Sequence, residues 1–90
     1  MDVNLTDFRL LLNVVHGGSL TAGAELSHVS IAAASMRMRG MEDALGVKLL
    51  QRAGGRMRLT EAGQLVATQA AVLLGAVDEL QADLGSWACS

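Results

Sequence analysis

Residues 30–45, SIAAASMRMRGMEDAL, have the pattern of a helix that packs one face against a core. Ser30 is a favourable N-cap, because its hydroxyl accepts a hydrogen bond from a first-turn amide, and Gly46 is a natural C-terminal stop. Between these ends, apolar side chains recur at steps of four, three and four residues, which places them on one side of a helix. The predicted core stripe consists of Ala34, Met38, Met41 and Leu45.

The opposite face of this predicted helix carries small or unbranched side chains and ends in a cation. Its members are Ile31, Ala32, Ser35, Met36 and Arg39. A slim face with no carboxylate before Glu42 fits the DNA major groove, which is just wide enough for a helix. An ordinary solvated helix is the alternative, since many helices combine an apolar face with an arginine on the other side. The sequence on either side of this helix is therefore needed to distinguish a DNA-contacting helix from an ordinary solvated one.

The composition predicts one small, mainly helical domain. The chain has 90 residues, of which 51% are hydrophobic and only 2% aromatic, so its core must be aliphatic. It contains no proline, which favours long uninterrupted helices. A core of this size is marginally stable, and dimerisation would add burial.

Charge is unevenly distributed along the chain, whose formal net charge is -2. Residues 37–58 contain six basic and two acidic side chains, a local charge of +4. Residues 61–83 contain four acidic and no basic side chains, a local charge of -4. Only the first of these segments favours binding to phosphate.

The sequence predicts no enzymatic activity, no metal site and no cofactor. Cys89 is the only cysteine, which excludes an internal disulfide and fits a reducing compartment. The two histidines are isolated, and no Ser/His/Asp or Cys/His set is evident. There is no charged leader and no run of about eighteen apolar residues. We therefore expect a cytoplasmic protein that does not bind a membrane.

A first helix is predicted near the N-terminus. Asn4 or Thr6 can cap it, and Gly17-Gly18 ends it. Asp7 and Arg9 are expected on its solvated side. The predicted core face at helical spacing consists of Leu5, Phe8, Leu12 and Val15.

A helix-turn-helix is predicted over about residues 20–39. Ser19 can cap a second helix of about two turns, and residues 27–29 form the turn that precedes Ser30. A short helix, a tight turn and a longer helix are the outline of this motif. The two helices can cross closely because the crossing has small residues, namely Gly23, Ala24, Ala33 and Ala34.

A basic β-hairpin, the wing, is predicted over about residues 49–59. Two short extended runs flank Gly54-Gly55, with Met57 and Leu59 turned inward and the neighbouring arginines outward. Arginines at such positions lie along a phosphate backbone or probe a minor groove, although a solvated basic hairpin is the alternative. The wing arginines are Arg52, Arg56 and Arg58.

A long last helix is predicted from Thr60, its N-cap, to about Leu84. Its apolar residues alternate in steps of four and three, a period of 3.5 that is typical of a coiled-coil seam. We expect homodimerisation through residues 73–84, with packing inside one chain as the alternative. The predicted interface residues are Val66, Ala70, Leu73, Val77, Leu80 and Leu84, and Trp87 continues the spacing.

In order and spacing, these motifs resemble the N-terminal winged helix-turn-helix of LysR-type transcriptional regulators. The matching residues are Gly18-Ser19-Leu20-Thr21, Ala24-Glu25, Val29-Ser30, Ala33, Ser35, Glu42, Leu45-Gly46-Val47-Lys48-Leu49, Arg52 and Leu59-Thr60-Glu61-Ala62-Gly63. The resemblance extends from about residue 5 to residue 84. It implies a mainly α fold of three helices and a short β-hairpin wing, followed by a long dimerisation or linker helix. The expected units are a DNA-binding domain over residues 1–60, the linker helix over 61–85, and a hinge remnant or tail over 86–90.

The resemblance implies a bacterial, dimeric or tetrameric, sequence-specific transcription factor that binds double-stranded DNA. A small-molecule effector would bind a C-terminal domain absent from this chain, which is either an excised domain or a natural truncation. The predicted DNA-contacting residues are Thr21, Ser30, Ile31, Ala32, Ser35, Met36, Arg37, Arg39, Arg52, Arg56 and Arg58. A winged-helix module for protein–protein interaction is the alternative function.

The recognition helix departs from the family where base contacts are expected. Ile31-Ala32 stand where many members have Gln-Pro, and Met36 stands where an arginine is common. Glutamine and arginine make bidentate hydrogen bonds to base edges, which these residues cannot make. We therefore expect specificity to depend on thymine methyl groups and on DNA shape as well as on hydrogen bonds.

Overall fold

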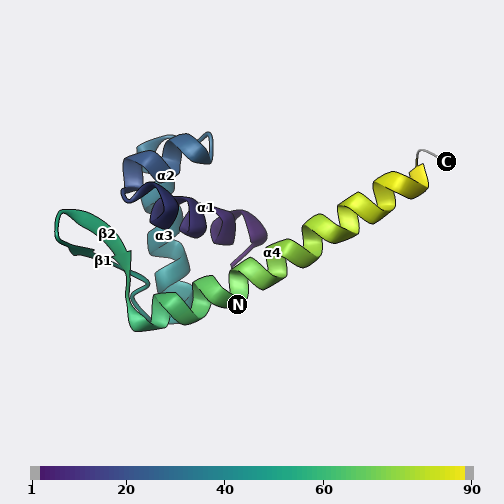
Figure 1. The fold of residues 1–90 in the computed structure, drawn as a ribbon. Coiled ribbons are helices and arrows are strands. Elements are labelled where there is room, and N and C mark those ends of the chain that lie inside the picture. Colours follow the sequence, from purple (N-terminus) through teal and green to yellow (C-terminus); the bar gives the residue numbers. More distant parts are fainter. Residues whose placement is uncertain (1–2, 89–90) are drawn as a thin grey trace.

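The computed structural model describes residues 3–88, which form four helices and one two-stranded antiparallel sheet (Figure 1). The elements are α1 (Leu5–Gly17), α2 (Leu20–Leu26), α3 (Ile31–Leu45), β1 (Leu50–Ala53), β2 (Arg56–Leu59) and α4 (Glu61–Ala88). The first three helices form a compact body with the β1–β2 wing at one end, and α4 extends from this body in the other direction. The predicted winged helix-turn-helix with a long C-terminal helix is confirmed.

Side-chain caps determine where the helices begin. Asn4 Oδ1 accepts a hydrogen bond from the Asp7 amide at 3.0 Å, and Asp7 Oδ2 accepts one from the Asn4 amide at 3.2 Å, so α1 begins with a capping box. The hydroxyls of Ser19 and Ser30 each accept a hydrogen bond at 3.0 Å from the amide three residues later. Gly46 ends α3 in the left-handed conformation, with φ 74°.

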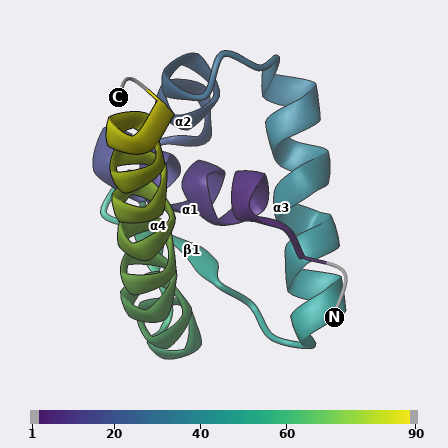
Figure 2. The ribbon, with the colours of Figure 1, turned by 90° about the vertical axis from the view of Figure 1, so that its right-hand side faces the viewer.

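The core is aliphatic and centres on α1, which lies between α3 and α4 (Figure 2). Its most deeply buried large side chains are Leu10, Leu11, Val14, Met41 and Leu49. The predicted face of α1 was partly wrong, because Leu5 is 39% exposed while Leu10 and Leu11 are buried. Neighbours on several sides explain the difference: α1 contacts α2, α3, α4 and β2, so its buried surface is wider than one stripe.

Asp7 was predicted to be solvated, but it is only 8% exposed. Besides closing the capping box, its Oδ1 accepts a hydrogen bond from Arg37 Nη1 of α3 at 3.2 Å. Arg9 is exposed as expected, and its Nη2 lies 3.1 Å from Asp78 Oδ1 of α4. Two ion pairs therefore connect α1 with the helices on either side of it.

The small residues of the helix-turn-helix have two separate roles. A Cβ added to Gly23 would collide with the side chain and backbone of Val14, so Gly23 permits close contact with α1 rather than with α3 as predicted. Ala24 and Ala34 are buried and belong to the core between the helices. In the turn, His28 takes a left-handed conformation with φ 58°.

The wing is attached to the body at the start of β1 and at the end of β2. Glu42 Oε2 accepts hydrogen bonds from the amides of Leu49 at 2.7 Å and Leu50 at 3.3 Å. Thr60 Oγ1 donates to the Lys48 carbonyl at 2.6 Å and accepts from the Gly63 amide at 2.9 Å. A Cβ on Gly63 would collide with the Leu49 carbonyl oxygen. The Leu-Thr-Glu-Ala-Gly motif therefore caps α4 and lets it lie close to Leu49, the residue before β1.

The two halves of α4 have different surroundings. Its first half contributes Gly63, Ala67, Ala70 and Leu74 to the buried part of the protein. Its second half extends beyond the body, which makes the molecule 50 Å long but only 24 by 22 Å across (Figure 1). The helix ends at Ala88, past the predicted end at Leu84.

By length and composition alone, α4 would qualify as a membrane-spanning helix, with a mean hydropathy of 1.2 over its apolar window. No such segment was expected from the sequence. Part of the helix packs on α1, and Asp78 in its middle pairs with Arg9. The remaining apolar surface of α4 is exposed in the single chain.

Candidate nucleic-acid interface

The outward face of α3 is exposed over its first turns. Ile31 is 52% and Met36 74% exposed, and Ala32 and Arg39 are exposed beside them. Ser35 is half-buried. The predicted core stripe of α3 is confirmed, with Ala34, Met38 and Met41 buried and Leu45 half-buried. The helix therefore presents the predicted slim surface to solvent.

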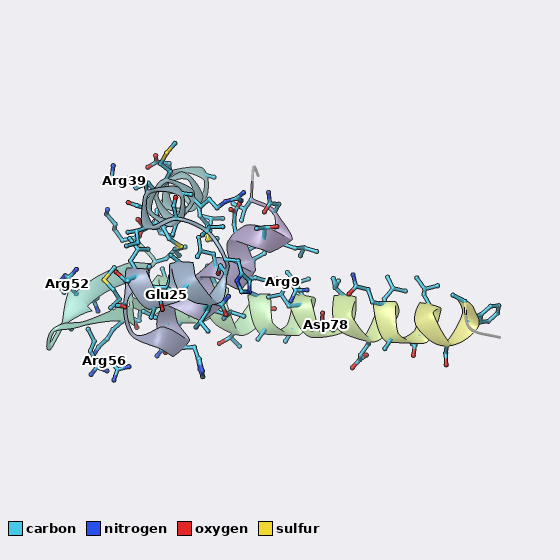
Figure 3. All side chains as sticks on the ribbon, turned by 90° about the horizontal axis from the view of Figure 1, so that it is seen from above. Arg9, Glu25, Arg39, Arg52, Arg56 and Asp78 are labelled. Atoms are coloured by element: carbon cyan, nitrogen blue, oxygen red, sulfur yellow. The ribbon has the colours of Figure 1, made fainter. Side chains whose placement is uncertain are left out.

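Ion pairing divides the basic side chains of residues 3–88 into two groups. The carboxylate-paired group is Arg9 with Asp78, Arg37 with Asp7, and Lys48 with Glu42 at 3.8 Å. The second group, called here the unpaired arginines, has no carboxylate partner within the described residues and consists of Arg39, Arg52, Arg56 and Arg58. Three of them are labelled in Figure 3, where they lie at the end of the molecule remote from the C-terminal half of α4. This end therefore has uncompensated positive charge.

Arg37, which the sequence predicts to contact DNA, differs from the unpaired arginines because it has a carboxylate partner, while its side chain stays 41% exposed. Its guanidinium lies on the side of α3 that faces α1, where it pairs with the nearly buried Asp7. It also lines a small pocket between α1 and the helix-turn-helix, together with Arg9 and Asn13. Its position gives it a structural role in holding α3 on α1.

The strand register places the wing arginines on both faces of the hairpin. Arg52 is paired with Met57, Ala53 with Arg56, and Gln51 with Arg58. Cross-strand partners share a face, so Arg52 projects on the face of Met57 while Arg56 and Arg58 project on the other. Met57 is half-buried and turned inward, as predicted. The wing is thus basic on both sides.

Thr21 and Ser30 mark the N-terminal ends of the two helices of the motif. Both residues are exposed. Ser30 Oγ accepts a hydrogen bond from the Ala33 amide, and its O–H can still donate to another group. At the start of a helix, free backbone amides and nearby hydroxyls can donate hydrogen bonds to a phosphate group.

Two exposed carboxylates border this surface, and sequence analysis assigned them no role. Asp43 follows Arg39 by one turn of α3, and Glu25 follows Thr21 by one turn of α2. Residues four apart lie on the same side of a helix, so each carboxylate stands next to a predicted DNA contact. These carboxylates repel phosphate and so oppose DNA contacts beyond Arg39 on α3 and beyond Thr21 on α2.

The predicted dimer interface on α4 divides at residue 73. Ala70 is only 1% exposed and Val66 is half-buried against the same core, so Ala70 is unavailable to a partner and the prediction for it is corrected. Leu73 is 48% exposed, and Leu80 and Leu84 are each 57% exposed. Val77 is half-buried. Beside Leu73 lies an apolar groove, lined by Phe8, Leu45, Leu65, Val66, Gln69, Ala70 and Leu73.

Over residues 3–88, no group of three or more His, Cys, Asp or Glu side chains is placed to hold a metal ion. Cys89, which entered the prediction of a reducing compartment, lies outside the described residues.

Known proteins match this chain in sequence and in structure. The model of the bacterial regulatory helix-turn-helix proteins of the lysR family matches residues 5–64. An uncharacterized HTH-type transcriptional regulator of Mycobacterium tuberculosis is 40% identical over 82 residues, which cover 91% of this chain and 26% of that protein. The chain thus spans about a quarter of the length of this relative.

Two solved structures of similar domains contain DNA. A complex of the BenM DNA-binding domain with catB site 1 DNA has a TM-score of 0.91 and 25% identity, with 98% of each chain covered. A complex of the CbnR DNA-binding domain with DNA has a TM-score of 0.83 and 26% identity, covering 98% of this chain and 100% of the other. Together with the match over residues 5–64, these findings show that the chain belongs to the LysR family of bacterial helix-turn-helix regulators.

Proposed function

We propose that this chain is the sequence-specific DNA-binding domain of a transcription regulator. The observation that carries the proposal is that Arg39 of α3 and Arg52 and Arg56 of the wing, which have no carboxylate partner within residues 3–88, lie at the same end of the molecule (Figure 3). Positive charge without a carboxylate partner is available to phosphate, which supplies most of the affinity of a DNA-binding protein. The DNA complexes of the similar BenM and CbnR domains support the same conclusion.

In this proposal the wing and α3 make different kinds of contact with DNA. The wing arginines and Thr21 contact the phosphate backbone and set the register of the domain on the duplex. Residues 30–39 of α3 enter the major groove. Arg39 and Ser35 donate hydrogen bonds there, while Ile31, Ala32 and Met36 contact thymine methyl groups. Because few side chains of α3 can bond base edges, DNA shape contributes to specificity.

The second copy of the chain sets the spacing of two half-sites. We infer that the exposed leucines Leu73, Leu80 and Leu84 pair with their counterparts along α4. This pairing would cover apolar surface that one chain leaves in solvent, as in a coiled coil. A two-fold dimer binds half-sites about one helical turn apart or at multiples of that distance. We further propose that a small-molecule effector acts on the whole regulator through a C-terminal domain outside this chain, which spans about a quarter of the length of its relative.

A protein-interaction module is the weaker alternative. Protein–protein interfaces are enriched in aromatic side chains, whereas α2, α3 and the wing contain none, and their arginines other than Arg37 have no carboxylate partner within residues 3–88. Because the basic surface is suited to binding DNA, we infer that the protein is a binding protein and not an enzyme. We also infer a cytoplasmic location, where bacterial DNA is found.

Selection of bound duplexes from a random library, with the 90-residue chain as the selecting protein, tests the proposal. We expect enrichment of an inverted repeat with thymine-rich half-sites. Failure to shift any duplex at low salt would contradict DNA binding and favour the protein-interaction module. Enrichment of a single half-site would retain DNA readout but contradict the dimer.

A further inference from the structure

Gly18, between α1 and α2, is buried beneath a wing side chain. It has φ 81°, which favours glycine, and a Cβ added there would lie 2.5 Å from Arg56 Nη2 and 2.9 Å from Arg56 Nε. The Arg56 guanidinium therefore rests on the bare backbone of this residue. Arg56 itself remains exposed, so only part of its guanidinium is covered.

A backbone hydrogen bond holds the same two segments together. The Met57 amide donates to the Gly18 carbonyl oxygen at 3.1 Å, so the outer edge of β2 is joined to the α1–α2 junction. This bond lies next to Arg56 in the chain. Arg56 is thus held against the body of the protein at the base of the helix-turn-helix motif, and Ser19, the N-cap of α2, follows Gly18 directly.

We propose that Gly18 is a positioning residue that presents Arg56 to one DNA phosphate at the junction between the wing and α2. This inference rests on the proposed function, and it assigns Arg56 a contact next to Thr21 instead of one in the minor groove. The wing and α2 would then bind the same strand. Arg56 meets the chemical requirements, because a guanidinium offers five donors in a fixed fork and has no carboxylate partner within residues 3–88.

The energetic reason is pre-organisation. A free arginine loses about 0.5–1.5 kcal/mol of side-chain freedom when it is immobilised at an interface. A guanidinium already resting on Gly18 loses less of this freedom on binding. A methyl group at position 18 would displace the guanidinium although the arginine is still present.

The wing offers a matched control for Gly18→Ala. Gly55 has φ 75°, nearly the same backbone conformation, but a Cβ there would meet no atom within 4 Å. Gly55→Ala therefore imposes similar backbone strain without touching Arg56. The difference between the two variants isolates the contact with the guanidinium.

The experiment measures the affinity of the full 90-residue chain for a mixed-sequence duplex over a series of salt concentrations. Arg56→Ala should lower the slope of log K against log salt by about one, because one phosphate contact is lost. Gly18→Ala should lower it by a similar amount, and Gly55→Ala should leave it unchanged. The double variant Gly18→Ala/Arg56→Ala should fall no further than Arg56→Ala alone. Arg56→Lys should restore most of the slope, since its charge is retained.

Several results would overturn the inference. Gly18→Ala with the parent slope, or a double variant that loses twice as much as Arg56→Ala, would show that Gly18 does not position Arg56. If Arg52→Ala lowers the slope while Arg56→Ala does not, the inference fails but DNA binding stands. A parent chain without salt-dependent binding to the duplex would instead contradict the proposed function.

A measurement on the unmodified chain covers the case in which Gly18→Ala does not fold. NMR spin relaxation of the arginine Nε–H groups reports the order of each side chain on the picosecond to nanosecond timescale. We expect Arg56 to be more ordered than Arg39 and Arg52 in the absence of DNA. Equal mobility of the three side chains would contradict the proposal.

Discussion

The outward face of α3 and the second half of α4 expose apolar side chains to a similar degree but differ in the charge beside them. Ile31 on α3 is 52% exposed, and Leu80 and Leu84 on α4 are each 57% exposed. Unpaired arginines accompany the first surface, whereas Glu79 and Asp83 accompany the second. Exposure alone therefore does not distinguish a DNA-binding face from a dimer interface. The sign of the neighbouring charge does, because only the basic face attracts a polyanion.

The largest effect is expected for substitutions in the proposed dimer interface on α4. Leu73→Asp with Leu80→Asp should abolish the dimer, because each buried leucine contributes about 1.5–3 kcal/mol and a carboxylate adds a desolvation cost. Sedimentation equilibrium measures the change, which we expect to be at least about a hundredfold in the dimer dissociation constant. Val72→Asp is the control, since Val72 is 65% exposed on the same helix but outside the predicted seam. A double variant as dimeric as the parent would refute the interface.

A smaller effect should separate the two halves of α4. Gly63→Ala forces a methyl group against the Leu49 carbonyl and should destabilise the fold by about 1–3 kcal/mol. Gly75→Ala, in the same helix with open space around it, should stabilise the fold by up to about 1 kcal/mol. Urea denaturation measures both changes. Equal stability of the two variants would contradict the close approach of α4 to Leu49.

Arg39 and Arg37 allow a direct test of the DNA-binding face of α3. They lie two positions apart, but only Arg37 has a carboxylate partner. Arg39→Ala should weaken binding to the selected duplex by about 1–3 kcal/mol, the value of a good base contact. Arg37→Ala should leave DNA affinity nearly unchanged and lower thermal stability, since Asp7 loses its partner. Titration of both variants with the same duplex decides the matter. The opposite order of affinities would return Arg37 to the DNA-contacting set.

The smallest effect concerns the apolar part of the DNA-binding face. Replacing single thymines of the selected half-site by deoxyuridine removes one methyl group and should cost about 0.8 kcal/mol where Met36 or Ile31 covers it. The same replacement should cost less in Met36→Ala. Parent affinities that do not respond to any thymine replacement would show that α3 does not recognise methyl groups.

Local features of the fold were predictable because they depend on residues close together in the chain. Ser19 and Ser30 cap their helices through an amide three residues away, and Gly46 ends α3 through its own backbone conformation. The inward turn of Met57 follows from strand alternation. The exposed face of α3 was predictable for the same reason, since helical periodicity alone separates it from the core stripe.

Other parts of the candidate site depended on segments distant in sequence. Arg37 was grouped with the DNA-contacting residues because no local pattern reveals its pairing with Asp7, thirty positions earlier. Ala70 fitted a coiled-coil seam, yet it is only 1% exposed and belongs to the core of the single chain. Both cases have one cause: periodicity identifies which residues share a face but not what lies against that face.

The sequence alone establishes the helix starts, the wing, the bipolar charge and the resemblance to the LysR family. Caps, turns and periodicity act over a few residues, so no distant contact is needed to see them. Tertiary structure alone decided which arginines remain without a carboxylate, which residues of α4 the core buries, and that the Arg56 guanidinium lies against Gly18. These properties arise when distant segments come into contact, and an ion pair or a buried glycine depends on its neighbour in space.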